Sequence, residues 1–130
     1  MVLEARTGSQ SLDAAEQDQL LAAARAAVEE ALGKPPVLVA RVLNKDGRWA
    51  FLFTDLQQQD GIPYDYSGTV KAEAARRGAV SHAYAALLRW GESGWRVVEC
   101  VIGPTDVAWE GWARKYNLSV SLFAFGGADE

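Results

Sequence analysis

His82 is the residue in this sequence best suited to general acid–base chemistry, since it is the sole histidine and imidazole titrates near neutral pH. A catalytic histidine needs a carboxylate that orients it, so the fold would have to bring Asp55, Asp65 or Asp106 within reach. No sequence spacing links any of these aspartates to His82. We therefore favour a surface or hydrogen-bonded histidine, with catalysis by His82 as the weaker alternative.

Other catalytic and metal-binding signatures are missing from the sequence. One histidine and one cysteine, Cys100, at separate strand positions do not form a metal-ligand set. Ser67, Ser81 and Ser93 lack the glycines of a nucleophile elbow, and the glycine-rich stretches match neither a P-loop nor a dinucleotide-binding fingerprint. We expect no metal and no cofactor, and we interpret Cys100 as a small buried apolar residue.

The Tyr64-Asp65-Tyr66 triplet is the main candidate for a binding surface. It falls in a long connection, residues 56–79, and two tyrosines on a loop place large amphipathic side chains where a partner can reach them. The alternative is a lid whose tyrosines pack onto the sheet. Neighbouring exposed aromatic residues, Trp112 and Phe123, would extend the contact surface for an unknown protein, a peptide or a small apolar ligand.

Composition limits the class of protein. The 130 residues have the apolar fraction (49%) and the charged fraction (23%) of one ordinary globular domain. A formal net charge of -4, with lysines and arginines scattered along the chain, argues against nucleic acid as a partner, because phosphates require a basic patch. The sequence contains no apolar run long enough for a transmembrane segment. It leaves the compartment open, and it also leaves a homodimer open.

Two predicted β-hairpins must position most of these residues. Apolar residues alternate with other residues in four segments, as is typical of strands, and turn-forming residues separate the segments within each hairpin. The expected hairpins pair residues 37–43 with 48–55 and residues 80–90 with 95–102. The second strand alternates aromatic residues with smaller ones, and its aromatic face comprises Trp49, Phe51 and Phe53.

A first helix is predicted from Asp13, which forms a capping box with Glu16, to Gly33, which ends it. The apolar stripe of this helix is mostly alanine, and small side chains allow close approach to a sheet. We therefore expect the helix to lie over the aromatic face of the second strand.

The long connection and the two ends of the chain are less regular. Within residues 56–79 we expect a short helix over 70–77, and we interpret the whole connection as cover for a sheet edge. Residues 118–130 are expected to dock on the domain as an extended tail, and residues 1–10 to form a loose arm.

A last helix is expected after the Gly-Pro-Thr-Asp turn at 103–106, because Thr105 or Asp106 can cap it. Three- and four-residue spacing places its apolar face at Trp109, Trp112, Ala113 and Tyr116. The predicted fold class is α+β. The N-terminal helix packs on a four-stranded antiparallel meander sheet, and the C-terminal helix closes an end or an edge.

Several segments carry a resemblance that covers most of the chain. They are Trp-Arg-Val-Val at 95–98, Val-Ile-Gly-Pro-Thr-Asp-Val-Ala-Trp at 101–109 and, upstream, residues 32–35 and 47–51. These segments resemble a group of small uncharacterised bacterial proteins, often exported, and the resemblance implies an exported or periplasmic single domain with no assigned activity. Because residues 1–10 do not have the pattern of a signal peptide, we expect any export signal to have been removed.

The order of the helix and the meander strands is similar to cystatin-like and NTF2-like folds. The inhibitory Gln-x-Val-x-Gly pattern of cystatins is missing, and no positions match the catalytic Asp-His-Tyr sets of NTF2-like enzymes. Two functions compete. The one we favour is a non-enzymatic binding or interaction module, and the alternative is a small NTF2-like hydrolase or isomerase that uses His82 with an aspartate.

Overall fold

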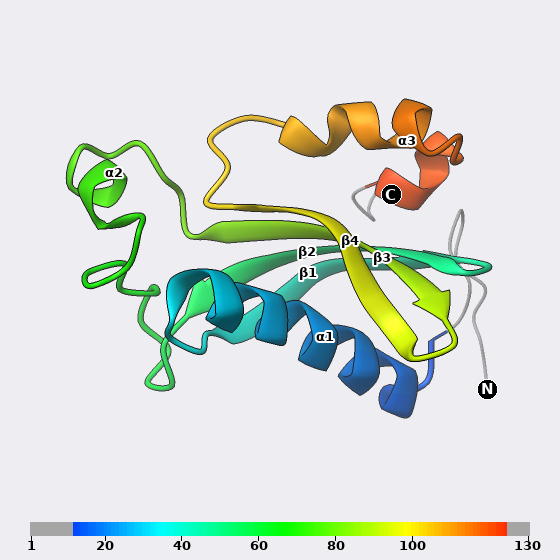
Figure 1. Ribbon diagram of the computed structural model, residues 1–130, viewed down its shortest axis with the longest axis horizontal. Helices are drawn as coiled ribbons and strands as arrows, with labels where there is room; N and C mark the ends of the chain where they lie inside the picture. Colours follow the sequence, from blue (N-terminus) through cyan, green and yellow to red (C-terminus); the bar gives the residue numbers. More distant parts are fainter. Residues whose placement is uncertain (1–11, 125–130) are drawn as a thin grey trace.

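The computed structural model describes residues 12–124 and shows a sheet that is covered on both faces (Figure 1). The expected arm at 1–10 and the end of the expected tail, 125–130, lie outside the described residues. In chain order the elements are α1 (Ala14–Leu32), β1 (Val37–Asp46), β2 (Trp49–Gln57), α2 (Ala72–Arg76), β3 (Ala83–Gly91), β4 (Gly94–Ile102), η1 (Ala108–Gly111), α3 (Trp112–Lys115) and η2 (Val120–Phe123).

The four strands form one antiparallel sheet in the order β1-β2-β3-β4, which confirms the predicted α+β class and the meander. The first turn lies later than predicted, because only Gly47 and Arg48 separate the paired residues Asp46 and Trp49. Gly47 has φ = +62°, a conformation that suits the first central position of a two-residue hairpin turn. β1 therefore continues through most of the segment expected to be a turn.

Each edge strand contains a β-bulge. Arg41 in β1 and Val98 in β4 are skipped where the pairing register shifts. A bulge of this kind bends the strand and shifts the alternation of the side chains beyond it. In β1, Leu38 lies on the α1 side of the sheet before the bulge, and Leu43 lies on the same side after it.

α1 begins and ends where the sequence predicts. The Asp13 carboxylate accepts a hydrogen bond from the backbone N–H of Glu16 (2.8 Å), and Gly33, at φ = +84°, donates its N–H to the Glu29 carbonyl (2.7 Å). The carboxylate of Glu16 accepts a hydrogen bond from Nζ of Lys45 in β1 (3.0 Å). This ion pair holds the first turn of α1 against the sheet.

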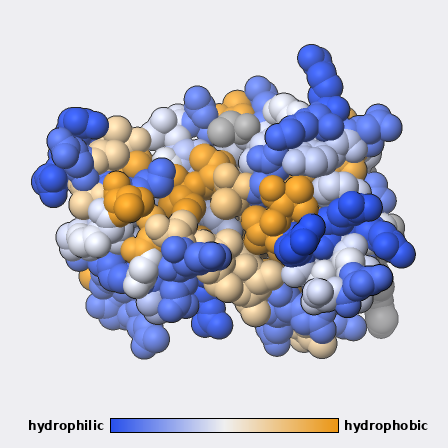
Figure 2. Space-filling model, in the orientation of Figure 1, coloured by the Kyte–Doolittle hydropathy of each residue, from blue (hydrophilic) through white to orange (hydrophobic). Residues whose placement is uncertain are grey.

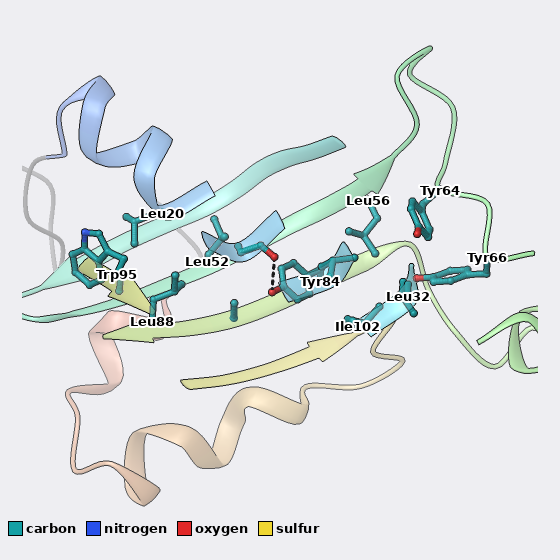
Figure 3. Packing of buried hydrophobic residues seen from close by; sticks show 14 residues of the cluster. Leu20, Leu32, Leu52, Leu56, Tyr64, Tyr66, Tyr84, Leu88, Trp95 and Ile102 are labelled. Carbon is teal, nitrogen blue, oxygen red and sulfur yellow. Dashed lines mark hydrogen bonds between the residues drawn. The ribbon is translucent and has the colours of Figure 1, made fainter. Parts of the chain in front are cut away.

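The core between α1 and the sheet is one continuous apolar cluster (Figure 3). α1 contributes one buried residue per turn, and these are Leu20, Ala24, Val28 and Leu32. The sheet contributes Ala50, Leu52, Leu56, Tyr84, Ala86, Leu88, Trp95 and Ile102. Figure 3 also shows the hydroxyl of Tyr84 donating a hydrogen bond to the carbonyl of Ala24 (3.1 Å). Small residues on both sides allow the helix to lie close to the strands.

The aromatic face of β2 points away from α1, so the prediction that α1 lies over it is wrong. Phe51 is fully buried in a second cluster on the opposite face of the sheet, and Trp49 and Phe53 pack at its margin. The other buried members are Val42, Ala85, Leu87, Trp112 and Leu122. The short segments after β4 bring too little apolar surface to build a core alone, so large rings from β2 fill the space beneath them.

η1, α3 and η2 lie across this second face (Figure 1). The prediction that the C-terminal helix closes an end or an edge of the sheet is therefore wrong. The prediction that Thr105 or Asp106 caps the last helix is also wrong, because η1 starts after Val107 and has no side-chain cap. A backbone hydrogen bond from Glu110 N to the Val107 carbonyl (2.9 Å) closes this first turn instead. The start is a 3₁₀-helix, for which such a bond is sufficient.

The tail after α3 docks on the sheet, but as a helical turn. Asn117 adopts φ = +56° and ends α3, and the η2 helix then buries Leu122. Nδ2 of Asn44 in β1 donates hydrogen bonds to the carbonyls of Leu122 (2.9 Å) and Ala124 (2.8 Å). The expected extended conformation is therefore wrong for residues 120–123, because this side chain satisfies carbonyls that a strand partner would otherwise bind.

Thr54 provides a stability test of the α1 face of the sheet. Its hydroxyl is buried and has no hydrogen-bond partner among the described residues, which costs free energy in the folded state. Thr54→Val removes the hydroxyl and keeps the branched shape, so we expect the free energy of unfolding to rise by about 1 kcal/mol. Urea unfolding of both proteins measures the change, and a fall of the same size would show that the hydroxyl is bonded.

Candidate functional site

His82 lies at the surface directly before β3, and its ring contacts the ring of Tyr66 with the centroids 5.6 Å apart. Asp55 pairs with Ala83 across β2 and β3, so the side chains of Asp55 and Ala83 point to the same face of the sheet. Successive side chains in an extended chain point to opposite faces, so the side chain of His82, directly before Ala83, points to the other face. The Asp55 carboxylate binds Nε of Arg41 (2.7 Å). His82 and Asp55 are thus not brought together.

The other two aspartates are not joined to His82 either. Asp65 accepts a hydrogen bond from the backbone N–H of Ser67 (2.9 Å), which lowers the pKa of its carboxyl group. Asp106 is exposed in the connection after β4. Among residues 12–124, no hydrogen bond or ion pair links the His82 side chain to a carboxylate. The geometry expected of an oriented catalytic base is therefore missing from the described part of the chain.

Tyr64 and Tyr66 are buried, with 3% and 2% of their surface exposed, so the expectation that they form an exposed surface is wrong. Their rings pack edge to face, 5.3 Å apart, at the end of the α1 core opposite Trp95 (Figure 3). The hydroxyl of Tyr64 donates to the Lys34 carbonyl (2.9 Å), and that of Tyr66 donates to the Ser81 carbonyl (2.7 Å). The triplet is therefore a packed lid, of which Asp65 is the exposed member.

Burial raises the pKa of Tyr66 to about 12, so its hydroxyl stays protonated and remains a donor at neutral pH. Gly103 makes this deep position available. Its backbone has φ = +71°, and a Cβ atom there would lie 3.2 Å from Oη of Tyr66 and 3.0 Å from Cβ of Val80. Only glycine combines this backbone conformation with such close approach. The Gly-Pro-Thr-Asp run thus accommodates the lid and does not cap a helix.

The connection that carries the triplet continues into α2, which is shorter than the helix expected over 70–77. Glu73 pairs with Arg77 at 3.6 Å, and both side chains are largely exposed. Val70, just before α2, is 83% exposed. This end of the molecule lies away from α3 (Figure 1).

Cys100 also differs from its prediction. It is exposed on the edge strand β4, where it pairs with Ala86 of β3, because no further strand covers that edge among the described residues. Partial desolvation raises the pKa of its thiol, which disfavours the reactive thiolate. Figure 2 shows other apolar side chains gathered over β4, surrounded by charged and polar ones.

Trp112 and Phe123, the remaining predicted contact residues, belong to the C-terminal layer. Trp112 is only 8% exposed and packs edge to face on Phe51, with ring centroids 6.4 Å apart, so its expected exposure is wrong. Phe123 is half-buried, and its ring lies 4.9 Å from that of Phe51. One side of Phe123 thus belongs to the core, and the other lines a groove.

This groove, which we call the C-terminal groove, has a volume of about 460 Å³ and runs between η1, α3 and η2. Its lining residues are Val107, Trp109, Glu110, Ala113, Val120 and Phe123. Val107 and Val120 are 48% and 80% exposed, although both are aliphatic. The ring of Trp109 packs on Phe53 (5.2 Å between centroids), so the wall it forms is anchored in the sheet. The groove combines a rigid floor with uncovered apolar rims.

Glu110 is the one charged residue among the described residues that line the groove. No ion pair joins it to a described residue, and this includes Arg114, four positions later in α3. Val107, Glu110 and Val120 were not among the predicted site residues. The two valines lie beside a predicted helix cap and in the predicted tail, and Glu110 lies within the predicted last helix, so their exposure depends on how these segments fold back on the sheet.

Comparisons with known proteins identify no relative of this chain. Searches of protein-family models, curated proteins and solved structures find no match. The resemblance to small bacterial proteins and the similarity to cystatin-like and NTF2-like folds therefore stay predictions. Among residues 12–124, no group of three or more potential metal ligands is found, and no helix has both the length and the apolar character to span a bilayer.

Proposed function

We propose that this protein is a non-enzymatic binding module whose C-terminal groove holds a small ligand with an apolar body and a positively charged end. The observation that carries this proposal is the groove itself, which leaves Val107 and Val120 exposed above an aromatic floor. A contiguous apolar surface that is left uncovered on a folded domain often marks a binding site. The volume of about 460 Å³ lies within the range of small-molecule sites.

Glu110 is the reason for proposing that one end of the ligand is positively charged. A carboxylate on the rim attracts an ammonium group and binds it through charge-assisted hydrogen bonds, while the aliphatic and aromatic walls contact the apolar body. A peptide with one apolar side chain beside a lysine would offer the same chemistry on a larger scaffold. The enzymatic alternative has no comparable support, because His82 is not oriented by a carboxylate among the described residues.

Titration with octylamine tests the proposal, with the change in tryptophan emission and the heat of binding as readouts. Val120→Lys places a second cation in the groove at a position that is 80% exposed, so folding should be unaffected. We expect this substitution to weaken octylamine binding by at least about tenfold, since it removes apolar contact and repels the ammonium group.

Val70→Lys is the matched control, because Val70 is equally exposed (83%) but lies outside the groove, and its octylamine affinity should equal that of the wild type. Glu110→Gln should weaken binding of octylamine and leave binding of octanol unchanged, since octanol lacks the charge. Equal octylamine affinity in the wild type and Val120→Lys would rule out this groove as the binding site.

A further inference from the structure

Three arginines that are scattered in the sequence converge at the opposite end of the sheet from the lid. Arg48, Arg89 and Arg96 line a groove of about 400 Å³, which we call the arginine groove. They come from the β1–β2 turn, from β3 and from β4. The other lining residues are Trp90, Gly91, Glu92, Ser93 and Gly94. Glu92 is the only acidic residue among them.

Backbone pairing fixes this arrangement. Arg89 and Arg96 are direct partners in the β3–β4 ladder, and Arg89 also pairs with Trp49 of β2. The backbone N–H of Trp90 donates to the carbonyl of Arg48 (2.7 Å), which holds the turn beside β3. The guanidinium of Arg89 lies over the Trp49 ring, 5.5 Å from its centroid. Two of the three cations are thereby held on rigid strands.

The charge of the arginine groove is not neutralised by the described residues. Arg41, Arg76 and Arg77 each pair with a carboxylate, whereas no ion pair joins Arg48, Arg89 or Arg96 to a described residue. Like charges directly opposite each other in a ladder destabilise a sheet. The chain as a whole carries a formal charge of -4, so this positively charged cluster has the opposite sign to the net charge of the protein.

We propose that the arginine groove binds a small ligand through a phosphate or diphosphate group. Guanidinium groups bind phosphate oxygens in pairs, and three of them around one small groove match a compact group of high negative charge. The indole of Trp90, 42% exposed beside the groove, offers an apolar contact to the rest of the ligand. A long polyanion would need a basic stripe beyond this groove, which an acidic chain does not favour.

Calorimetric titration with pyrophosphate tests this inference, and it does not depend on the C-terminal groove. We expect Arg89→Gln/Arg96→Gln to weaken pyrophosphate binding by at least about a hundredfold, because two charge-assisted contacts are lost. Arg96→Lys keeps the charge but not the paired donors, so its affinity should fall between those of the wild type and the double variant. Arg25→Gln, an exposed arginine on α1, should bind as the wild type does.

Parallel titrations with citrate and with single-stranded DNA separate the ligand classes. Pyrophosphate should bind more tightly than either, and tighter binding of DNA would replace the proposed small ligand by a nucleic acid. Equal pyrophosphate affinity in the wild type and in both Arg89→Gln/Arg96→Gln and Arg48→Gln would overturn the proposal. Unchanged circular dichroism and urea midpoints of the variants show that the folds compared are the same.

Discussion

Replacing Phe51 with alanine should lower the free energy of unfolding by about 3 to 5 kcal/mol. Phe51 is fully buried, and its ring packs against the rings of Trp109 (6.3 Å), Trp112 (6.4 Å) and Phe123 (4.9 Å). These rings come from segments anchored at several points, so they cannot close the cavity completely. Urea unfolding followed by circular dichroism measures the loss.

Val39→Ala is the control for Phe51→Ala, since Val39 is an apolar strand residue that is 37% exposed. Its loss should stay below about 1 kcal/mol, because little buried volume is removed. A loss of that small size in Phe51→Ala would mean that the C-terminal layer does not cover the aromatic face of β2. The comparison therefore tests which face of the sheet each end of the chain covers.

Tyr66→Ala should also cost about 3 to 5 kcal/mol, since it removes a ring that is 2% exposed. It would leave a cavity beside Tyr64 and remove the hydrogen bond to the Ser81 carbonyl. Tyr66→Phe keeps the ring and should lose only about 1 to 2 kcal/mol, the cost of an unpaired buried acceptor. Thermal or urea unfolding of the three proteins separates the packing contribution from the hydrogen bond.

Val70→Ala, in the same connection but 83% exposed, should stay within about 0.5 kcal/mol of the wild type. If Tyr66→Ala were equally harmless, the tyrosines would be free at the surface, and the exposed-loop interpretation would return. The expected large difference between Tyr66 and Val70 distinguishes a packed lid from an exposed contact loop.

Local chemistry made α1 and the strand order predictable. Asp13 and Gly33 act on backbone groups a few residues away, so their roles follow from spacing alone. The alternation in β2 likewise predicts that Phe51 and Leu52 lie on opposite faces of the sheet, but it does not predict which of these faces α1 covers. That choice depends on where the chain travels after β4, and no pattern within β2 contains this information.

The candidate sites depend on longer distances. Burial of Tyr66 requires the space left by Gly103, which lies in another segment, so the triplet alone could not decide between an exposed loop and a packed lid. Arg89 and Arg96 could have been found by counting outward from the β3–β4 turn, because hairpin partners lie symmetrically about it. Arg48 could not, since it joins them only through pairing between β2 and β3.

The two bulges have a consequence for how copies of this protein meet in concentrated solution. Arg41 and Val98 interrupt β1 and β4, the two strands with one unpaired edge in the described sheet. A regular edge offers a row of free N–H and C=O groups onto which another strand can add, and such growth leads to fibrils. A bulge breaks that row, and the 62% exposed Arg41 adds a charge to one edge. Edge-to-edge aggregation is thereby disfavoured at both sides of the sheet.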